Sequence, residues 1–200
     1  MHRRLFISSL AALPLAVHAA GFTAIDITGA NIGPDYQLSY SDGKPASLRD
    51  FKGKYVMLFF GFTQCPDVCP TTLARATEIK RLLGADGDKL QVVFVTVDPE
   101  RDTGTLLAEY MRAFDPTFVA VRGNAEQTAK AAKDFKIFYR KVPSGSSYTM
   151  DHTALTYIFD ANGKIRLAVK HEQTAQQVAA DLRLLMHPKK ETGFLKGLFQ

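Results

Sequence analysis

Residues 55–73 read YVMLFFGFTQCPDVCPTTL, a stretch that begins as a buried strand and ends inside a helix. The run Tyr55–Phe62 is continuously apolar, which is typical of a strand buried on both faces of a sheet. Apolar residues at helical spacing follow over Thr71–Leu83. Cys65 and Cys69, the two cysteines of the chain, lie between the two segments. This order predicts an α/β sheet with the cysteines at the carboxyl end of a strand, where such sheets bind ligands.

Strands and helices alternate along the rest of the chain. Asp42-Gly43 predicts an N-terminal hairpin within Tyr36–Leu48, and Asn162-Gly163 predicts a second hairpin near the end. Further predicted strands are Leu90–Val97, Phe118–Val121, Leu155–Phe159 and Ile165–Val169, and further predicted helices are Thr105–Phe114, Asn124–Phe135 and Thr174–Met186. The pattern indicates an α/β fold with a mixed, mostly parallel central sheet flanked by helices and closed by an antiparallel edge.

The first 20 residues resemble a secretory signal peptide. Arg3 and Arg4 form a basic start, the apolar run Leu5–Val17 follows, and cleavage is expected after Ala19 or Ala20. The apolar run is shorter than the ~20 residues that a spanning helix needs, which favours cleavage over a membrane anchor. We therefore expect a signal peptide at 1–20, one domain at 21–187 and a flexible basic tail at 188–200.

The composition and the predicted signal peptide argue for a globular, exported protein and against nucleic-acid binding. Apolar residues make up 46% and charged residues 22%, which is typical of a globular chain. Loss of the leader, which carries two arginines and no acidic residue, lowers the formal charge from +5 to +3. An exported protein without a basic stripe and interleaved aromatics is not expected to bind nucleic acid. The expected location is the bacterial periplasm, with at most peripheral membrane contact, or the membrane itself if the leader is retained.

The Cys-x-x-x-Cys spacing favours metal binding over a structural disulfide. Residues four apart on a helix have Cβ atoms about 5–6 Å apart, which suits two ligands of one ion. An unstrained disulfide needs roughly 3.5–4.5 Å between the Cβ atoms. The start of a helix also stabilises an anionic thiolate, so both sulfurs are expected to be reactive. A thioredoxin-type redox pair would have two intervening residues rather than three.

His152 is the histidine that the predicted topology brings nearest to the cysteines. It precedes the strand Leu155–Phe159, and if that strand runs antiparallel to Tyr55–Phe62, His152 lies at the edge where the cysteines emerge. Position alone leaves two roles open, a metal ligand or a loop histidine with ordinary hydrogen bonds. His171 and His187 lie beside or within the last helix among charged residues, and we expect them to be solvated.

Two thiolates and one imidazole form a soft and incomplete ligand set. Structural zinc needs a fourth protein ligand. Cuprous ion favours thiolates, and cupric ion adds imidazole readily. The net charge of two thiolates and one copper ion is zero with cupric copper and minus one with cuprous copper. The site can therefore hold either oxidation state. The donor set therefore favours copper.

Five side chains near these positions have a supporting or a purely structural interpretation. Asp151 either orients the neighbouring imidazole or ends a loop. The acidic residues after the second buried strand either form a docking rim and support the site or cap a turn and a helix, and the second interpretation is the simpler for each. These are Asp98, Glu100 and Asp102. Met150 is expected to fill a gap in the packing.

Taken together, four segments resemble the Sco/SenC family. They are Lys52-Gly53-Lys54, GFTQCPDVCPTTL at 61–73, VTVDPERDT at 95–103 and DHT at 151–153, and the resemblance spans roughly Asp26–Met186. CPDVCP after one buried strand, DPERDT after the next and a late Asp-His form a specific combination.

The resemblance implies a thioredoxin-like fold, no organic cofactor and one copper ion held by Cys65, Cys69 and His152. It implies a role in building the copper A centre of cytochrome c oxidase. In that role the protein either donates copper or reduces the thiols of that site, with Cys65 and Cys69 as a redox-active pair. The expected partners are the copper A subunit and, beyond it, periplasmic copper carriers or thiol reductants. Many members of the family keep a membrane anchor, whereas this leader is expected to be cleaved.

Overall fold

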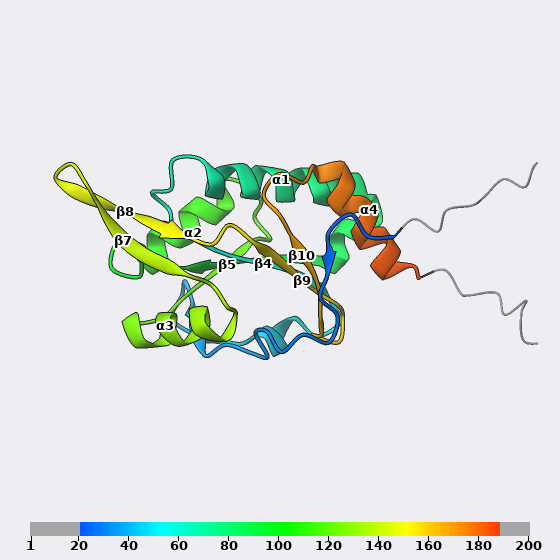
Figure 1. The fold of residues 1–200 in the computed structure, drawn as a ribbon, viewed down its shortest axis with the longest axis horizontal. Helices are drawn as coiled ribbons and strands as arrows, with labels where there is room; N and C mark the ends of the chain where they lie inside the picture. The colour runs from blue at the N-terminus through cyan, green and yellow to red at the C-terminus, as the bar shows by residue number, and fades with distance from the viewer. Residues whose placement is uncertain (1–20, 189–200) are drawn as a thin grey trace, which may run out of the picture.

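The two continuous apolar runs become neighbouring strands at the centre of a sheet (Figure 1). The structure is a computed structural model that describes residues 21–188, so the predicted signal peptide and all of the predicted tail except Pro188 lie outside the described residues. The strands are β1 Ile25–Asp26, β2 Leu38–Tyr40, β3 Pro45–Ala46, β4 Tyr55–Gly61, β5 Leu90–Thr96, β6 Val119–Arg122, β7 Tyr139–Ser144, β8 Ser147–His152, β9 Thr156–Phe159 and β10 Ile165–Val169. The helices are α1 Val68–Leu83, α2 Gly104–Arg112, α3 Ala125–Asp134 and α4 Ala175–Met186, with two short 3-10 helices at Leu48–Phe51 and Gly84–Lys89.

The central sheet of the described chain has eight strands in the order β1-β10-β9-β4-β5-β6-β2-β3. β4 and β5 run parallel from the pair Tyr55 and Leu90 to the pair Gly61 and Thr96. Every residue of β5, and every residue of β4 after Tyr55, is buried. The prediction of two strands buried on both faces is therefore confirmed, because helices cover both faces.

The sheet is mixed, as predicted, but its parallel part is smaller than expected. Parallel pairing is confined to β4, β5 and β6. β9 runs antiparallel to β4, and β10 and β1 continue antiparallel beyond it. On the other side the predicted N-terminal hairpin is confirmed as β2–β3, with Gly43 in the turn at a φ of 87°. Hairpins account for the antiparallel pairs β2–β3 and β9–β10, whereas the pairs β4–β9, β2–β6 and β1–β10 join strands far apart in the sequence.

Helices pack on both faces of this sheet. Figure 1 shows α1 and α4 side by side on one face and α3 on the opposite face. The predicted helices that begin at Asn124 and Thr174 are confirmed, and each begins with a complete capping box, formed by Asn124 with Gln127 and by Thr174 with Gln177.

Residues 139–152 form a feature that the sequence interpretation missed. The sequence predicts no strand between the helix Asn124–Phe135 and the strand Leu155–Phe159, yet this segment forms the hairpin β7–β8, which turns at Gly145 with a φ of 57°. β7 and β8 pair only with each other among the described strands. The hairpin extends beyond the body of the molecule (Figure 1). His152 is consequently the last residue of a strand rather than part of a loop.

The two ends of the described chain lie together at the end of the molecule opposite the hairpin (Figure 1). The N-terminal segment is attached to α4, because the buried carboxylate of Asp181 accepts hydrogen bonds from the amide and hydroxyl of Thr23 and from the amide of Ala24. Between residues 21 and 188, no helix has the length and apolar character needed to cross a bilayer.

Candidate metal centre

The cysteines lie at the carboxyl end of β4, where the chain turns into α1. α1 begins at Val68, earlier than the predicted Thr71, so Cys69 is in its first turn. Cys65 lies before the helix, in the turn that links it to β4. The expectation that both sulfurs share one helical face is therefore wrong, because the helix begins only after Pro66 and Asp67.

The sulfur of Cys65 takes part in starting the helix. The backbone N–H of Cys69 donates to Cys65 Sγ at 3.4 Å. Asp67, at the N-cap position, makes no side-chain bond to the helix backbone, and its carboxylate accepts from the Thr71 hydroxyl instead. First-turn N–H groups lack partners within the helix, so an acceptor placed there is stabilised, above all an anionic one.

This environment makes the two thiols unequal. The hydrogen bond from Cys69, opposed by burial, lowers the pKa of Cys65 to about 4, with smaller contributions from His152 and from the backbone N–H groups of Asp67 and Cys69. The same contact with Cys65, together with burial, raises the pKa of Cys69. These opposite directions favour a thiolate at Cys65 and a neutral thiol at Cys69 in the apo site. Binding of a cation to both sulfurs must release the proton of Cys69.

Gly61 makes room for the buried sulfur. A Cβ atom at this position would lie 2.7 Å from Cys69 Sγ and 2.7 Å from the Phe94 ring. Only glycine lets the sulfur lie this close to the end of β4.

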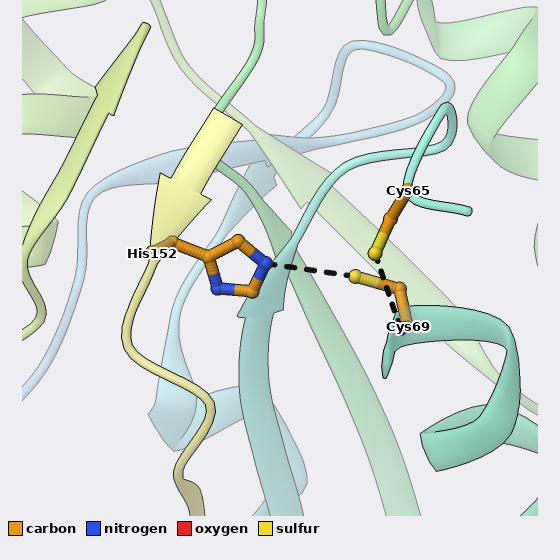
Figure 2. Close-up of side chains that lie close together, drawn as sticks. All are labelled: Cys65, Cys69 and His152. Carbon is orange, nitrogen blue, oxygen red and sulfur yellow. Dashed lines mark hydrogen bonds between the residues drawn. The ribbon is translucent and has the colours of Figure 1, made fainter. Parts of the chain in front are cut away.

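His152 reaches the cysteines from β8. Its Nε2 lies 3.7 Å from Cys69 Sγ (Figure 2). Its Nδ1 lies 3.1 Å from the carbonyl oxygen of Thr153, which can only accept a hydrogen bond. Nδ1 therefore carries the proton in the neutral ring, and the lone pair of Nε2 is directed at the sulfurs. The ring also packs edge-on against Phe62, with centroids 5.9 Å apart.

Three potential ligand atoms thus converge from three segments of chain. The sulfurs of Cys65 and Cys69 and a ring nitrogen of His152 all lie within 4.8 Å of one another, close enough to bind one ion. Cys65 and His152 are half-buried and line a shallow pocket, whereas Cys69 is buried behind them. His171 and His187 do not join this cluster. His187 instead pairs with Asp86 at 2.7 Å, and His171 lies beside Arg75.

The side chains predicted to support the site have specific partners. The carboxylate of Asp151 pairs with Arg140 at 3.2 Å, so it does not orient the imidazole, whose Nδ1 faces a backbone carbonyl. Glu100 pairs with Lys141 at 2.5 Å on the surface. Met150 is buried in the core, as predicted for a packing residue.

The prediction that Asp98 and Asp102 cap a turn and a helix is wrong, because within the described residues neither carboxylate accepts from the backbone of its own turn or of α2. The cap of α2 is Thr103. Asp102 is fully buried and accepts from the Thr63 amide at 3.1 Å, the Thr63 hydroxyl at 2.5 Å and the Thr96 hydroxyl at 2.5 Å. It thereby links the cysteine turn to the end of β5. Asp98 contacts the β7–β8 hairpin through Tyr148, at 2.9 Å.

Sequence reasoning missed Gly61 and the residues that bind Asp98. A glycine inside an apolar strand indicates a close approach of other atoms, so Gly61 carried a usable signal. The Ser-Gly pair at Ser144 and Gly145 was a turn signal for the missed hairpin.

Comparisons with family profiles, with known sequences and with solved structures all find proteins of the same family. The SCO1/SenC family profile matches residues 26–187. The SCO2-like protein of Rickettsia felis is 36% identical over 181 residues, which cover 89% of this chain and 82% of the relative. The structure of ScoI from Bradyrhizobium japonicum with copper bound is 39% identical with a TM-score of 0.70, covering 77% of this chain and 99% of that one. The solution structure of apo Sco1 from Thermus thermophilus is 36% identical with a TM-score of 0.74, covering 85% and 99%. The predicted thioredoxin-like fold, as it occurs in Sco proteins, is thereby confirmed.

Proposed function

The chain belongs to the SCO1/SenC family, and from that membership and its site we propose that it is an exported copper metallochaperone. It binds one copper ion through Cys65, Cys69 and His152 and assists assembly of the copper A centre of cytochrome c oxidase. The convergence of these three ligand atoms within 4.8 Å is the observation that carries the proposal.

The donor set supports copper in either oxidation state. Two thiolates suit cuprous ion, and an unprotonated imidazole nitrogen suits cupric ion. Cys65 is already a thiolate above about pH 4, so copper binding needs the loss of only one further proton, from Cys69. The copper-bound Bradyrhizobium japonicum relative has the same fold at 39% identity.

The exposure of the site supports transfer to a protein partner. Cys65 and His152 line the pocket between the cysteine turn and the hairpin, so an incoming ligand can replace them one at a time. The copper A subunit of the oxidase is the proposed acceptor. Periplasmic copper carriers or thiol reductants are proposed to supply copper and electrons. The leader at residues 1–20 supports a periplasmic location, which the N-terminal mass of the protein from its native compartment tests.

Replacement of His152 tests the ligand set. His152→Ala should abolish the thiolate-to-cupric absorption band and keep cuprous affinity within about tenfold, because two thiolates remain. The measurement is a titration of the reduced protein with each copper ion against a competing chelator. His187→Ala, a surface histidine paired with Asp86, is the control. A cupric spectrum unchanged in His152→Ala would show that the ligand assignment is wrong.

A second candidate function is thiol–disulfide reduction of a copper-accepting protein. An accessible thiolate at Cys65 with a buried thiol at Cys69 is the arrangement of an attacking and a resolving cysteine. Cys65 attacks the target disulfide and releases one target thiolate, and Cys69 then releases the second and closes the Cys65–Cys69 disulfide. A thiol reductant must supply two electrons to reset the pair.

An assay without copper separates the two functions. The reductase predicts many cycles of reduction of an oxidised copper A domain by the apo protein, provided that dithiothreitol is present. Cys69→Ser should stop at the mixed disulfide. Failure of the apo protein to turn over would eliminate this candidate and leave the metallochaperone.

A further inference from the structure

A buried carboxylate joins the hairpin to the loop after β5. Asp98 is 1% exposed and accepts from Arg101 Nε at 2.5 Å and from the Tyr148 hydroxyl at 2.9 Å. Arg101 Nη1 also donates to the Tyr148 carbonyl at 2.7 Å, and the guanidinium lies 3.7 Å from the centroid of the Tyr148 ring. We call Asp98, Arg101 and Tyr148 the latch.

The latch also reaches the cysteine turn. Arg101 Nη1 donates to Gln64 Oε1 at 3.1 Å, and Gln64 directly precedes Cys65. The Phe62 ring lies between the latch and the imidazole, with its centroid 6.0 Å from the Arg101 guanidinium and 5.9 Å from the centroid of the His152 ring. One arginine therefore contacts both segments that carry the potential ligands.

The position of His152 depends on such side-chain contacts. Within residues 21–188 no strand of the central sheet pairs with β7 or β8, so no backbone ladder fixes the hairpin to the body. The ion pair between Lys141 and Glu100 is exposed at both ends and contributes little. The side chains of Asp98 and Arg101 are only 1% and 16% exposed. Removal of one member of such a buried ion pair leaves the charge of the other uncompensated. The latch thus holds the hairpin near its tip, and Met150, which is buried in the core, holds it near its base.

We propose that the latch is a positioning device that keeps His152 at the sulfurs and thereby sets which oxidation state of copper the site prefers. With the latch closed, two sulfurs and an imidazole face one ion, a set that accepts cupric copper. With the latch open, the hairpin carries the imidazole away and the two sulfurs remain, a set that favours cuprous copper. The proposal rests on the proposed copper binding. The three residues act through His152 and do not themselves bind the metal.

Paired variants test the latch without relying on a buried unpaired charge. Arg101→Gln with Asp98→Asn removes both charges together, and Tyr148→Phe removes a single hydrogen bond. We expect the double variant to lose about 10–100-fold in cupric affinity, the range known for residues that orient metal ligands. Cuprous affinity should change by less than about threefold. Arg101→Lys keeps the positive charge opposite Asp98 but loses the contacts of the planar guanidinium. Its cupric affinity should therefore lie between that of the double variant and that of the wild type.

Arg140→Gln is the matched control, because Arg140 lies on the same hairpin but pairs with the exposed Asp151. A readout without metal is amide hydrogen exchange in the apo protein. Exchange over β7 and β8 should accelerate in the double variant and not in Arg140→Gln. An unchanged ratio of cupric to cuprous affinity, or equal loss of both with unchanged exchange, would overturn the proposal. A wild-type protein that binds neither ion would instead overturn the proposed function.

Discussion

Cys65 and Cys69 occupy equivalent places in a repeated Cys-Pro motif, yet their sulfurs differ in chemistry. Cys65 lies ahead of the helix and accepts hydrogen bonds, whereas Cys69 is 1% exposed behind it. The difference arises from the point at which α1 begins, because one sulfur faces free N–H groups and the other faces the core.

The reactivity of Cys65 should show this difference. Because its pKa is lowered to about 4, its alkylation by iodoacetamide should be nearly constant between about pH 6 and pH 8 and decline only near pH 4. An ordinary thiol, with a pKa of about 8.5, would lose most of its reactivity over the same range. Peptide mass spectrometry of the apo protein gives the rate for each cysteine.

Cys69→Ala provides the control, because it removes the largest cause of the lowered pKa. The inflection of the Cys65 rate should then move to higher pH. A wild-type inflection near pH 8 would contradict the inequality of the two sulfurs.

Single residues of the site were predictable to different degrees. Cys65, Cys69 and His152 could be brought together from strand order, because β9 runs antiparallel to β4 as expected. Gly61 signalled a close approach of other atoms, but the sequence did not reveal that Cys69 Sγ lies 2.7 Å from the place of its missing Cβ atom. The protonated nitrogen of His152 also depends on the Thr153 carbonyl, whose direction sequence does not reveal.

Elements with strong periodicity were predictable, and the hairpin was not. β4, β5 and the capped helices α3 and α4 carry apolar runs or capping pairs that act locally. β7 and β8 carry mixed polar and apolar residues and, among strands within residues 21–188, pair only with each other. Side chains from the loop after β5 hold them in place, and that relation is invisible in any local pattern.

The turn between β4 and α1 should depend on Thr63. Its amide and hydroxyl both donate to the buried Asp102, so Thr63→Val should lower the free energy of unfolding by about 1–2 kcal/mol. Cuprous affinity should also decrease, because the turn carries Cys65. Chemical denaturation and copper titration give the two quantities.

Thr71→Val is the matched control, because Thr71 is exposed and its hydroxyl bonds only to the exposed Asp67. Equal changes in the free energy of unfolding and in cuprous affinity for the two variants would show that the bond between Thr63 and Asp102 does not stabilise the turn.

At the scale of the whole molecule, stability and metal binding should be separable. Asp181 accepts three hydrogen bonds from Thr23 and Ala24 at the end opposite the hairpin. Asp181→Ala should lower the free energy of unfolding by about 2–4 kcal/mol, because a buried amide loses its partner. Copper affinity should remain as in the wild type. Asp88→Ala, at an exposed position, controls for the lost charge.

Thermal denaturation and chelator competition on the same samples test this separation. Loss of copper affinity in Asp181→Ala at a temperature where the protein is folded would contradict it.

The fold class was predictable at this scale because alternating strands and helices permit few topologies. The extent of parallel pairing was not, because the antiparallel pairs β4–β9 and β2–β6 join strands far apart in the sequence.

The placement of residues 21 and 188, the two ends of the described part of the chain, far from the hairpin has a practical consequence. A resin or sensor chip joined near Gly21 or Pro188 would leave the pocket facing the bulk solution. In that orientation an acceptor domain in solution could reach the copper-loaded pocket of the immobilised protein. The association and dissociation rates of the two proteins could then be measured on the sensor surface.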